Sequence, residues 1–244
     1  PGLRRLHSPD LVIVNAENAA AGYGITRDTA GELFAAGADC LTTGNHVWAQ
    51  REAYELLAAD HRILRPANYA PTAPGIGADL FPTPAGLVAV ISLVGRIFME
   101  PADCPFRAAS ALVGQLSPMS QAIVVDFHAE ATSEKAAMAH YLDERVTAVI
   151  GTHTHVQTAD EHILPGGTAF ISDCGMTGPT GTVIGVKPDI VVNRFVSGLP
   201  ARFDVPKGGP AGLAGVLITT PPGSLRASAI ERIQVLTDGA DEVS

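Results

Sequence analysis

The sequence has little of several things that place a protein in a specialised class. Only 3 of its 244 residues are cysteine, they lie far apart, and no CxxC pair occurs. This argues against a disulfide framework and favours a reducing, cytoplasmic compartment. No apolar run approaches the roughly 18 residues that cross a bilayer, so we expect no membrane partner. The N-terminal residues also lack the pattern of a secretory signal.

Charge is also scarce, and it is unevenly divided between the two signs. Charged residues make up 17% of the chain and hydrophobic residues 46%, a balance that excludes a disordered protein. Lys and Arg number 16 against 25 Asp and Glu, which gives a formal net charge of −9. This sign disfavours a nucleic-acid scaffold. A small anionic substrate stays compatible, because bound metal ions can supply local positive charge.

Short apolar runs alternate with helical stretches along the whole chain. We expect strands at 11–15, 40–43, 87–94, 122–127, 147–150 and 168–172, and helices at 26–36, 49–59 and 133–144. This alternation predicts an α/β fold. Two further runs, 213–220 and 227–236, predict an antiparallel hairpin, so we expect mixed sheets. The Pro- and Gly-rich segment 71–84 is expected to be an ordered loop and not a domain boundary.

Polar side chains follow several of these strands at the point where each strand ends. They include four of the eight histidines, together with one carboxylate and two amides. The set comprises Glu17, Asn18, Asn45, His46, His128, His153 and His155. Each residue alone also fits a structural role. Because ligands bind beyond the carboxyl ends of the strands in an α/β sheet, we expect the seven together to form one site.

The donor types at these strand ends indicate a metal centre. In an extended segment His153 and His155 would point to the same side, and Gly151 ahead of them permits close backbone approach. Nitrogen and oxygen donors without a thiolate suit Mn, Fe or Zn better than a structural zinc site. Imidazoles with a bridging carboxylate such as Glu17 suit two metal ions about 3.5–4 Å apart that act on phosphate esters.

Longer motifs carry a resemblance to a known family. In chain order they are Asn15-Ala-Glu-Asn-Ala-Ala20, Thr43-Gly-Asn-His46, Arg65-Pro-Ala-Asn68, Asp126-Phe-His-Ala-Glu-Ala-Thr-Ser-Glu-Lys135, Gly151-Thr-His-Thr-His-Val-Gln-Thr-Ala-Asp160 and Gly175-Met-Thr-Gly-Pro179. Together they resemble the bacterial YmdB-type branch of the calcineurin-like metallophosphoesterases, over essentially the whole chain. The resemblance implies a four-layer α/β/β/α sandwich with mixed sheets. It also implies phosphodiesterase activity on 2′,3′-cyclic nucleotides.

The resemblance further implies two divalent metal ions per chain, Fe or Mn by preference, with Zn and Mg as alternatives. Glu17 resembles the carboxylate that bridges both ions. The other ligands would be Asn45, His128 and His153 for one ion, and Asn18 and His155 for the other.

His46 resembles the family's catalytic histidine. After attack by a hydroxide held between the metals, it would protonate or stabilise the leaving oxygen. The expected partner is a small phosphoester such as 2′,3′-cyclic AMP, with RNA ends as a further option. Phe195 and Phe203 permit a homo-oligomer without requiring one.

One departure from the family leaves alternatives open. The family's first strand ends in Gly-Asp-x-x-Gly, whose Asp binds a metal, and this motif should end just before Pro1. We therefore expect residues 1–244 to form a single metallophosphoesterase domain without that strand, which we attribute to omission. True loss of the Asp would instead give a catalytically impaired regulatory protein that binds nucleotide or protein. A metal-dependent amidohydrolase is a third reading, but its HxH comes early on a barrel strand, whereas here it starts at His153.

Overall fold

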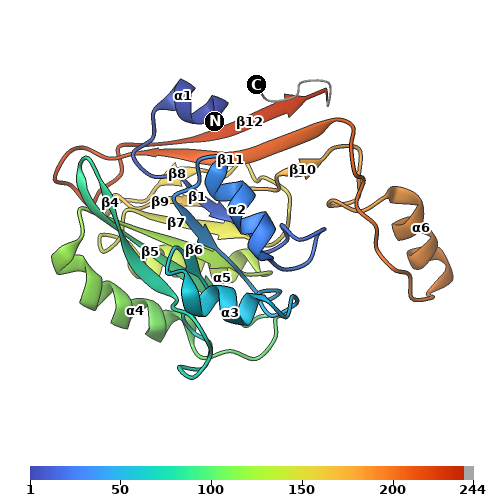
Figure 1. The fold of residues 1–244 in the computed structure, drawn as a ribbon. Coiled ribbons are helices and arrows are strands. Elements are labelled where there is room, and N and C mark those ends of the chain that lie inside the picture. The colour runs from blue at the N-terminus through green and yellow to red at the C-terminus, as the bar shows by residue number, and fades with distance from the viewer. Residues whose placement is uncertain (239–244) are drawn as a thin grey trace.

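The apolar runs in the middle of the chain form a six-stranded mixed sheet (Figure 1). In the computed structural model, which describes residues 1–238, its strands in spatial order are β4 (Ala78–Thr83), β5 (Gly86–Val94), β6 (Ala122–His128), β7 (Ala148–Thr152), β9 (Ala169–Ile171) and β8 (His162–Ile163). The four central strands are parallel, and β4 and β8 pair antiparallel at the two edges. The carboxyl ends of β5, β6, β7 and β9 therefore share one edge of the sheet.

Helices α4 (Pro105–Leu116) and α5 (Thr132–Leu142) cover one face of this sheet. Alternate residues of β5 and β6, such as Leu93 and Phe127, pack in one core with Val113 of α4 and Met138 of α5. Period-2 alternation in the strands explains why one set of side chains faces these helices. The other set faces the remaining sheets.

A three-stranded parallel sheet lies on the opposite face of the six-stranded sheet. Its strands are β1 (Ile13–Asn15), β2 (Cys40–Thr42) and β3 (Ile63–Leu64), in that order. Cys40 and Leu64 pack against Phe81 and Val90 of the large sheet. Helices α2 (Arg27–Ala35) and α3 (Ala53–Ala59) cover its other face, in a core that contains Leu41 and Leu57.

The predicted C-terminal hairpin is confirmed. Strands β11 (Ala211–Thr219) and β12 (Ala229–Thr237) are antiparallel, and the short β10 (Gly178–Pro179) joins their sheet. Val216 and Ile230 pack against Ile150 and Ile171 of the large sheet. Three further short elements are α1 (Gly2–His7), a 3₁₀ helix (Ser117–Met119) and α6 (Pro188–Ser197).

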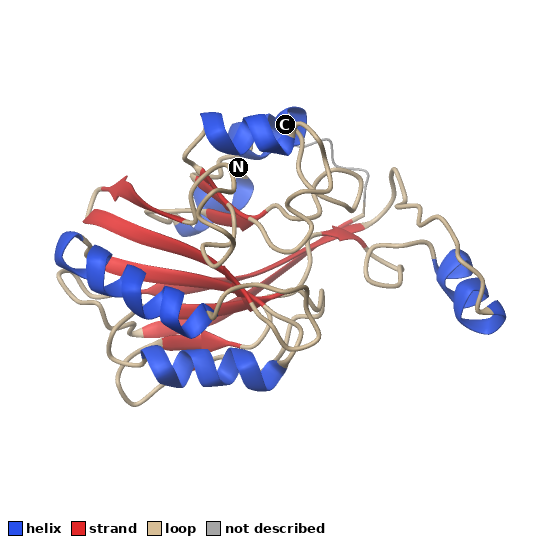
Figure 2. Ribbon diagram, turned by 90° about the horizontal axis from the view of Figure 1, so that it is seen from below, coloured by secondary structure: helices blue, strands red, loops and turns tan. Residues whose placement is uncertain are grey.

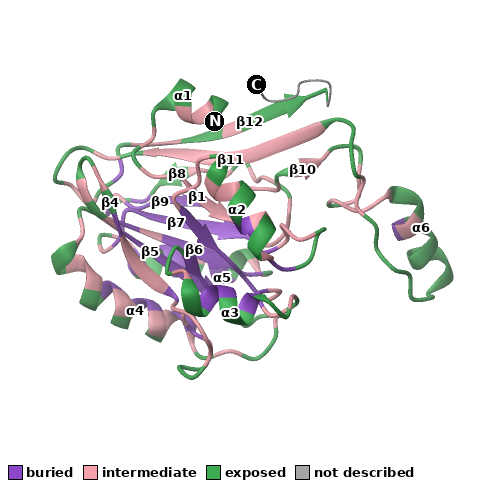
Figure 3. Ribbon diagram, viewed as in Figure 1, coloured by how far each residue is buried: buried purple, intermediate pink, exposed green. Residues whose placement is uncertain are grey.

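Helix α6 stands away from the rest of the molecule in both ribbon views (Figures 1 and 2). Most of its surface is exposed, as Figure 3 shows. Its exposed apolar side chains include Phe195, which is 82% exposed, and Val196, which is 83% exposed. Within the described residues, no helix is both long and apolar enough to cross a membrane.

The predicted elements are mostly confirmed, with shifts at their ends. Thr26 caps α2 in a reciprocal capping box with Thr29, so the helix starts at the N-terminal end of the expected range. The helix expected from residue 49 begins only at Ala53. The expectation that 71–84 is a loop is wrong for its second half, where Ala78–Thr83 forms β4. Pro82 is tolerated there because β4 is an edge strand and needs fewer backbone donors.

Candidate metal centre

The seven predicted site residues all follow strand ends that meet at one place. Glu17 and Asn18 follow β1, and Asn45 and His46 follow β2 of the small sheet. The others come from the large sheet: His128 ends β6, and His153 and His155 follow β7. The site therefore lies where the carboxyl ends of the parallel strands of both sheets converge, the usual position of ligand sites in α/β folds.

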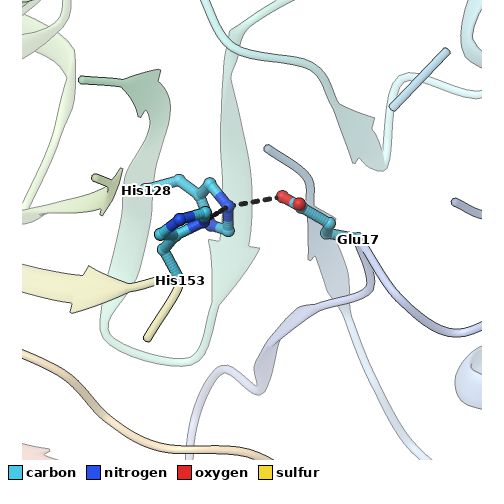
Figure 4. A group of neighbouring side chains, drawn as sticks. All are labelled: Glu17, His128 and His153. Carbon is cyan, nitrogen blue, oxygen red and sulfur yellow. Dashed lines mark hydrogen bonds and ion pairs between the residues drawn. The ribbon is translucent and has the colours of Figure 1, made fainter. Parts of the chain in front are cut away.

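His128 is the centre of the first group of side chains, of which Figure 4 shows Glu17, His128 and His153. Its Nε2 lies 2.7 Å from Oε2 of Glu17, 3.0 Å from Nδ1 of His153 and 3.1 Å from Oδ1 of Asn45. Ligand atoms of Glu17, His128 and His153 all lie within 4.8 Å of one another, a spacing that could hold a metal ion. The side chains of Glu17 and His128 are only 1% and 2% exposed.

The buried carboxylate of Glu17 has the character of a metal ligand. Oε2 is buried without a hydrogen-bond partner, although His128 Nε2 is close by. A Cβ on Gly44 would lie 1.6 Å from this oxygen and 2.3 Å from Cδ2 of His128, so only glycine leaves room for the pair. Carboxylate, imidazole and amide oxygen without thiolate are donors that suit Mn, Fe and Zn. The residues present therefore fit a divalent metal ion.

The electrostatics keep Glu17 and His153 in their metal-binding forms. Burial acts to raise the pKa of Glu17, but the adjacent rings of His128 and His46 outweigh it and hold the pKa at about 2. Burial, helped by the charge of His128, lowers the pKa of His153 to about 4. Near neutral pH the site thus offers an ionised carboxylate and a neutral imidazole at His153, the forms that bind metal.

A second group of contacts continues from Glu17 through His46 to His155. Nδ1 of His46 lies 3.0 Å from Oε1 of Glu17 and 2.9 Å from Oδ1 of Asn18. The amide of Asn18 also contacts Nε2 of His155 at 3.1 Å. The ring of Tyr23 lies against His46, with 4.1 Å between the ring centroids. Because Nδ1 of His46 is engaged, Nε2 is the nitrogen that can reach a substrate.

The expected extended geometry of the His153–His155 segment is wrong. Strand β7 ends at Thr152, and both histidines have positive φ angles, 111° for His153 and 66° for His155. His153 turns toward His128, whereas His155 turns toward Asn18, and its Nδ1 donates to the carbonyl of Ile184 at 3.2 Å. Positive φ in a non-glycine residue costs roughly 1–3 kcal/mol and clusters at functional sites.

A buried ion pair stabilises this strained segment. Lys135 Nζ lies 2.9 Å from Asp173 Oδ2, and both side chains are 1% exposed. The Asp173 carboxylate also accepts from the backbone N–H groups of Thr154 and Gly175, each at 2.9 Å. The predicted close approach at Gly151 is confirmed, since a Cβ there would lie 1.9 Å from the carbonyl oxygen of Ser172.

Sequence reasoning missed the polar residues that support the site. Asp126, Lys135 and Asp173 are all buried beside it, and Glu130 lies 3.1 Å from Nε2 of His153 at the rim. One signal was available, because Asp126 interrupts the apolar run Ile123–Phe127. A charged residue in a buried strand needs partners, and this need points to a polar network.

Acceptor atoms that converge at the strand ends of a mixed α/β fold define a candidate metal centre. Comparison with known proteins places this chain in a family. The protein-family model described as "YmdB-like protein" matches residues 1–233. A Bacillus subtilis (strain 168) protein named 2′,3′-cyclic-nucleotide 2′-phosphodiesterase is 42% identical over 238 residues, which cover 98% of this chain and 90% of that protein. The chain therefore belongs to the YmdB-like family.

Solved structures agree with this placement. A Thermus thermophilus protein described as hypothetical is 39% identical with a TM-score of 0.89, and the match covers 97% of this chain and 94% of that one. A Mycoplasma pneumoniae protein described as a novel phosphatase is 34% identical with a TM-score of 0.89, over 98% and 86%. A Staphylococcus aureus chain described as a putative 5′-nucleotidase, 16% identical with a TM-score of 0.56 over 89% and 42%, shares the mixed α/β fold.

Proposed function

We propose that this protein is a metal-dependent phosphodiesterase that hydrolyses 2′,3′-cyclic nucleotides. The observation that carries the proposal is the convergence of Glu17, Asn45 and His153 on Nε2 of His128, at the open edge of the sheets. The name of the Bacillus subtilis relative supports the substrate class. RNA ends that carry a 2′,3′-cyclic phosphate present the same ester and belong to the proposed class.

Two divalent metal ions, Fe or Mn by preference with Zn and Mg as alternatives, are the proposed cofactors. When bound, they would polarise the phosphate oxygens and lower the pKa of an attacking water. The proposed ligands are Glu17 as the bridge, with Asn45, His128 and His153 for one ion and Asn18 and His155 for the other. The orphaned oxygen of Glu17 and the absence of thiolate donors among these residues support this set.

His46 is the proposed catalytic residue. Glu17 and Asn18 hold its Nδ1, and Tyr23 lies against its ring, so Nε2 has a defined direction. From this position His46 would protonate or stabilise the leaving oxygen, a contribution typically worth about 10²–10⁴-fold in rate.

An open hollow of about 260 Å³ beside His155 is the proposed site of the nucleobase. Val156, Met176 and Ile184 are among the residues that line it, with Thr180 and Thr182 at its side. No Lys, Arg, Asp or Glu is among its lining residues, all of which lie in the described part of the chain. Apolar and hydroxyl surfaces suit a base better than a phosphate, which needs charged or N–H donors.

The packing supports the finer architecture that the resemblance implies. Helices α2 and α3, the small sheet, the six-stranded sheet, and helices α4 and α5 follow one another as four layers of a proposed α/β/β/α sandwich in one domain. Free Cys40, Cys104 and Cys174 support the cytoplasmic placement. The exposed apolar residues of α6 support self-association, which sedimentation velocity would test.

The test is hydrolysis of 2′,3′-cyclic AMP by protein stripped with a chelator and then reconstituted with Mn²⁺. We expect turnover only after Mn²⁺ is added, and we expect Glu17→Gln to abolish it. Glu55→Gln, a change of the same kind at an exposed position of α3, should leave turnover unchanged. Undiminished turnover in the chelator would contradict the proposal, and nucleotide binding without turnover would favour a regulatory binding protein.

A further inference from the structure

Asp126 gathers hydrogen bonds from three strands beneath the candidate metal centre. Its carboxylate is 5% exposed on β6 and accepts from Asn15 Nδ2 at 2.9 Å, from the Thr42 hydroxyl, and from the Thr152 hydroxyl at 2.7 Å. Asn15 and Thr42 belong to the small sheet, whereas Asp126 and Thr152 belong to the large sheet. The network therefore ties the two sheets together at the edge where the site residues emerge.

The hydroxyl of Thr152 links this hydrogen-bond network to His128. A hydroxyl has one proton, and in Thr152 that proton points to the carboxylate of Asp126. The oxygen of Thr152, 2.9 Å from Nδ1 of His128, must then accept a hydrogen bond from that nitrogen. Nδ1 of His128 therefore carries a proton, and the lone pair of the neutral ring lies on Nε2.

The partners of Nε2 are themselves acceptors. Glu17 offers a carboxylate oxygen and Asn45 an amide oxygen. His153 offers Nδ1, because its Nε2 lies 3.1 Å from Glu130 and donates to that carboxylate. Only a cation, either a proton or a metal ion, satisfies four acceptors that meet at one point.

We propose that Asp126, acting through the Thr152 hydroxyl, is a positioning residue that fixes the tautomer of His128 and so turns Nε2 toward the metal. This proposal about Asp126 rests on the proposed function, so its test does not measure substrate hydrolysis. In Asp126→Asn, the amide N–H can donate to Thr152, whose proton is then free to point at His128. The hydrogen bonds of the network would then run in the opposite direction. The ring proton of His128 would lie on Nε2, where it competes with the metal.

The test measures two quantities for the wild type, Thr152→Val, Thr152→Ser and Asp126→Asn. The first is the Kd for Mn²⁺, by titration calorimetry. The second is the protonation pattern of the His128 ring nitrogens in the metal-free protein, by nitrogen-15 NMR. Thr168→Val is the matched control, because Thr168 is buried with its hydroxyl on a carbonyl 2.9 Å away, outside the network.

We expect Thr152→Val and Asp126→Asn to weaken Mn²⁺ binding by about 10–100-fold and to move the proton of the neutral ring toward Nε2. Thr152→Ser, which keeps the hydroxyl, should restore both readouts, and Thr168→Val should lose stability without changing either. The inference is overturned if Thr152→Val binds Mn²⁺ as the wild type does, with an unchanged nitrogen-15 pattern. A wild type that binds no Mn²⁺ would instead defeat the proposed function, while the NMR pattern would still decide the tautomer.

Discussion

The buried ion pair between Lys135 and Asp173 should be worth more to this protein than any exposed pair. Both side chains are 1% exposed, so removing one partner leaves an uncompensated charge in the interior. Such a loss costs about 3–5 kcal/mol, a large part of a typical stability of about 5–15 kcal/mol. At roughly 2–4 °C per kcal/mol for a chain of this size, Asp173→Asn should lower the Tm by roughly 6–20 °C.

The two single variants should differ in a defined order. In Lys135→Met the Asp173 carboxylate keeps its bonds from the N–H groups of Thr154 and Gly175, so this variant should lose less stability than Asp173→Asn. The double variant should lose less than the sum of the singles, because it leaves no unpaired charge. Lys187→Ala, which breaks an exposed ion pair, should change the stability far less than either single variant.

Urea unfolding of the metal-free protein, followed by the fluorescence of the single tryptophan, Trp48, measures these differences. Asp173→Asn should also weaken Mn²⁺ binding, because it loosens the segment that holds His153 and His155. A cost below about 1 kcal/mol for both single variants would refute the reasoning that the pair stabilises this segment.

Three further predictions concern the site itself. His46→Ala should lower turnover of 2′,3′-cyclic AMP by about 10²–10⁴-fold with unchanged metal content, and full turnover would refute its role. Met176→Ala should lower kcat/KM for that nucleotide but not for bis(p-nitrophenyl) phosphate, which has no base. An equal loss of kcat/KM on both substrates would contradict the placement of the base in the hollow. The pKa of His153 is lowered from 6.5 to about 4 in the folded protein. Between these two pH values the unfolded chain binds more protons than the folded protein. The stability of the metal-free protein should therefore fall as the pH drops from 6.5 to about 4. Urea midpoints across the pH range measure this slope, and His153→Gln should flatten it; an identical slope in that variant would contradict the assignment.

The sequence predicted which of these side chains lie close together because parallel strands impose a common edge. Glu17, Asn45 and His153 lie on loops just beyond strand ends, and His128 is the last residue of β6. These strands come from two different sheets. A buried, apolar strand can be recognised from its own short stretch of sequence. The alternation of strands with helices then predicts that neighbouring strands are parallel. The convergence of these residues therefore needed no knowledge of the loops between them.

The geometry within the site could not be predicted in the same way. The period-2 argument for His153 and His155 assumed that the strand continues, but β7 ends at Thr152. What bends the chain there is Asp173, which is distant in sequence and is anchored by Lys135 from helix α5. The same limit applies to β4, since only the tertiary position of an edge strand makes Pro82 acceptable within it.

The metal content of the purified protein tests the central claim most directly. After reconstitution with Mn²⁺, elemental analysis should find about two metal ions per chain. Gly44→Ala should lose them, because its methyl group would lie 1.6 Å from Oε2 of Glu17, whereas Gly114→Ala, where a Cβ meets open space, should retain them. A wild-type protein that stays metal-free, or a Gly44→Ala variant with a full complement of metal, would contradict the account.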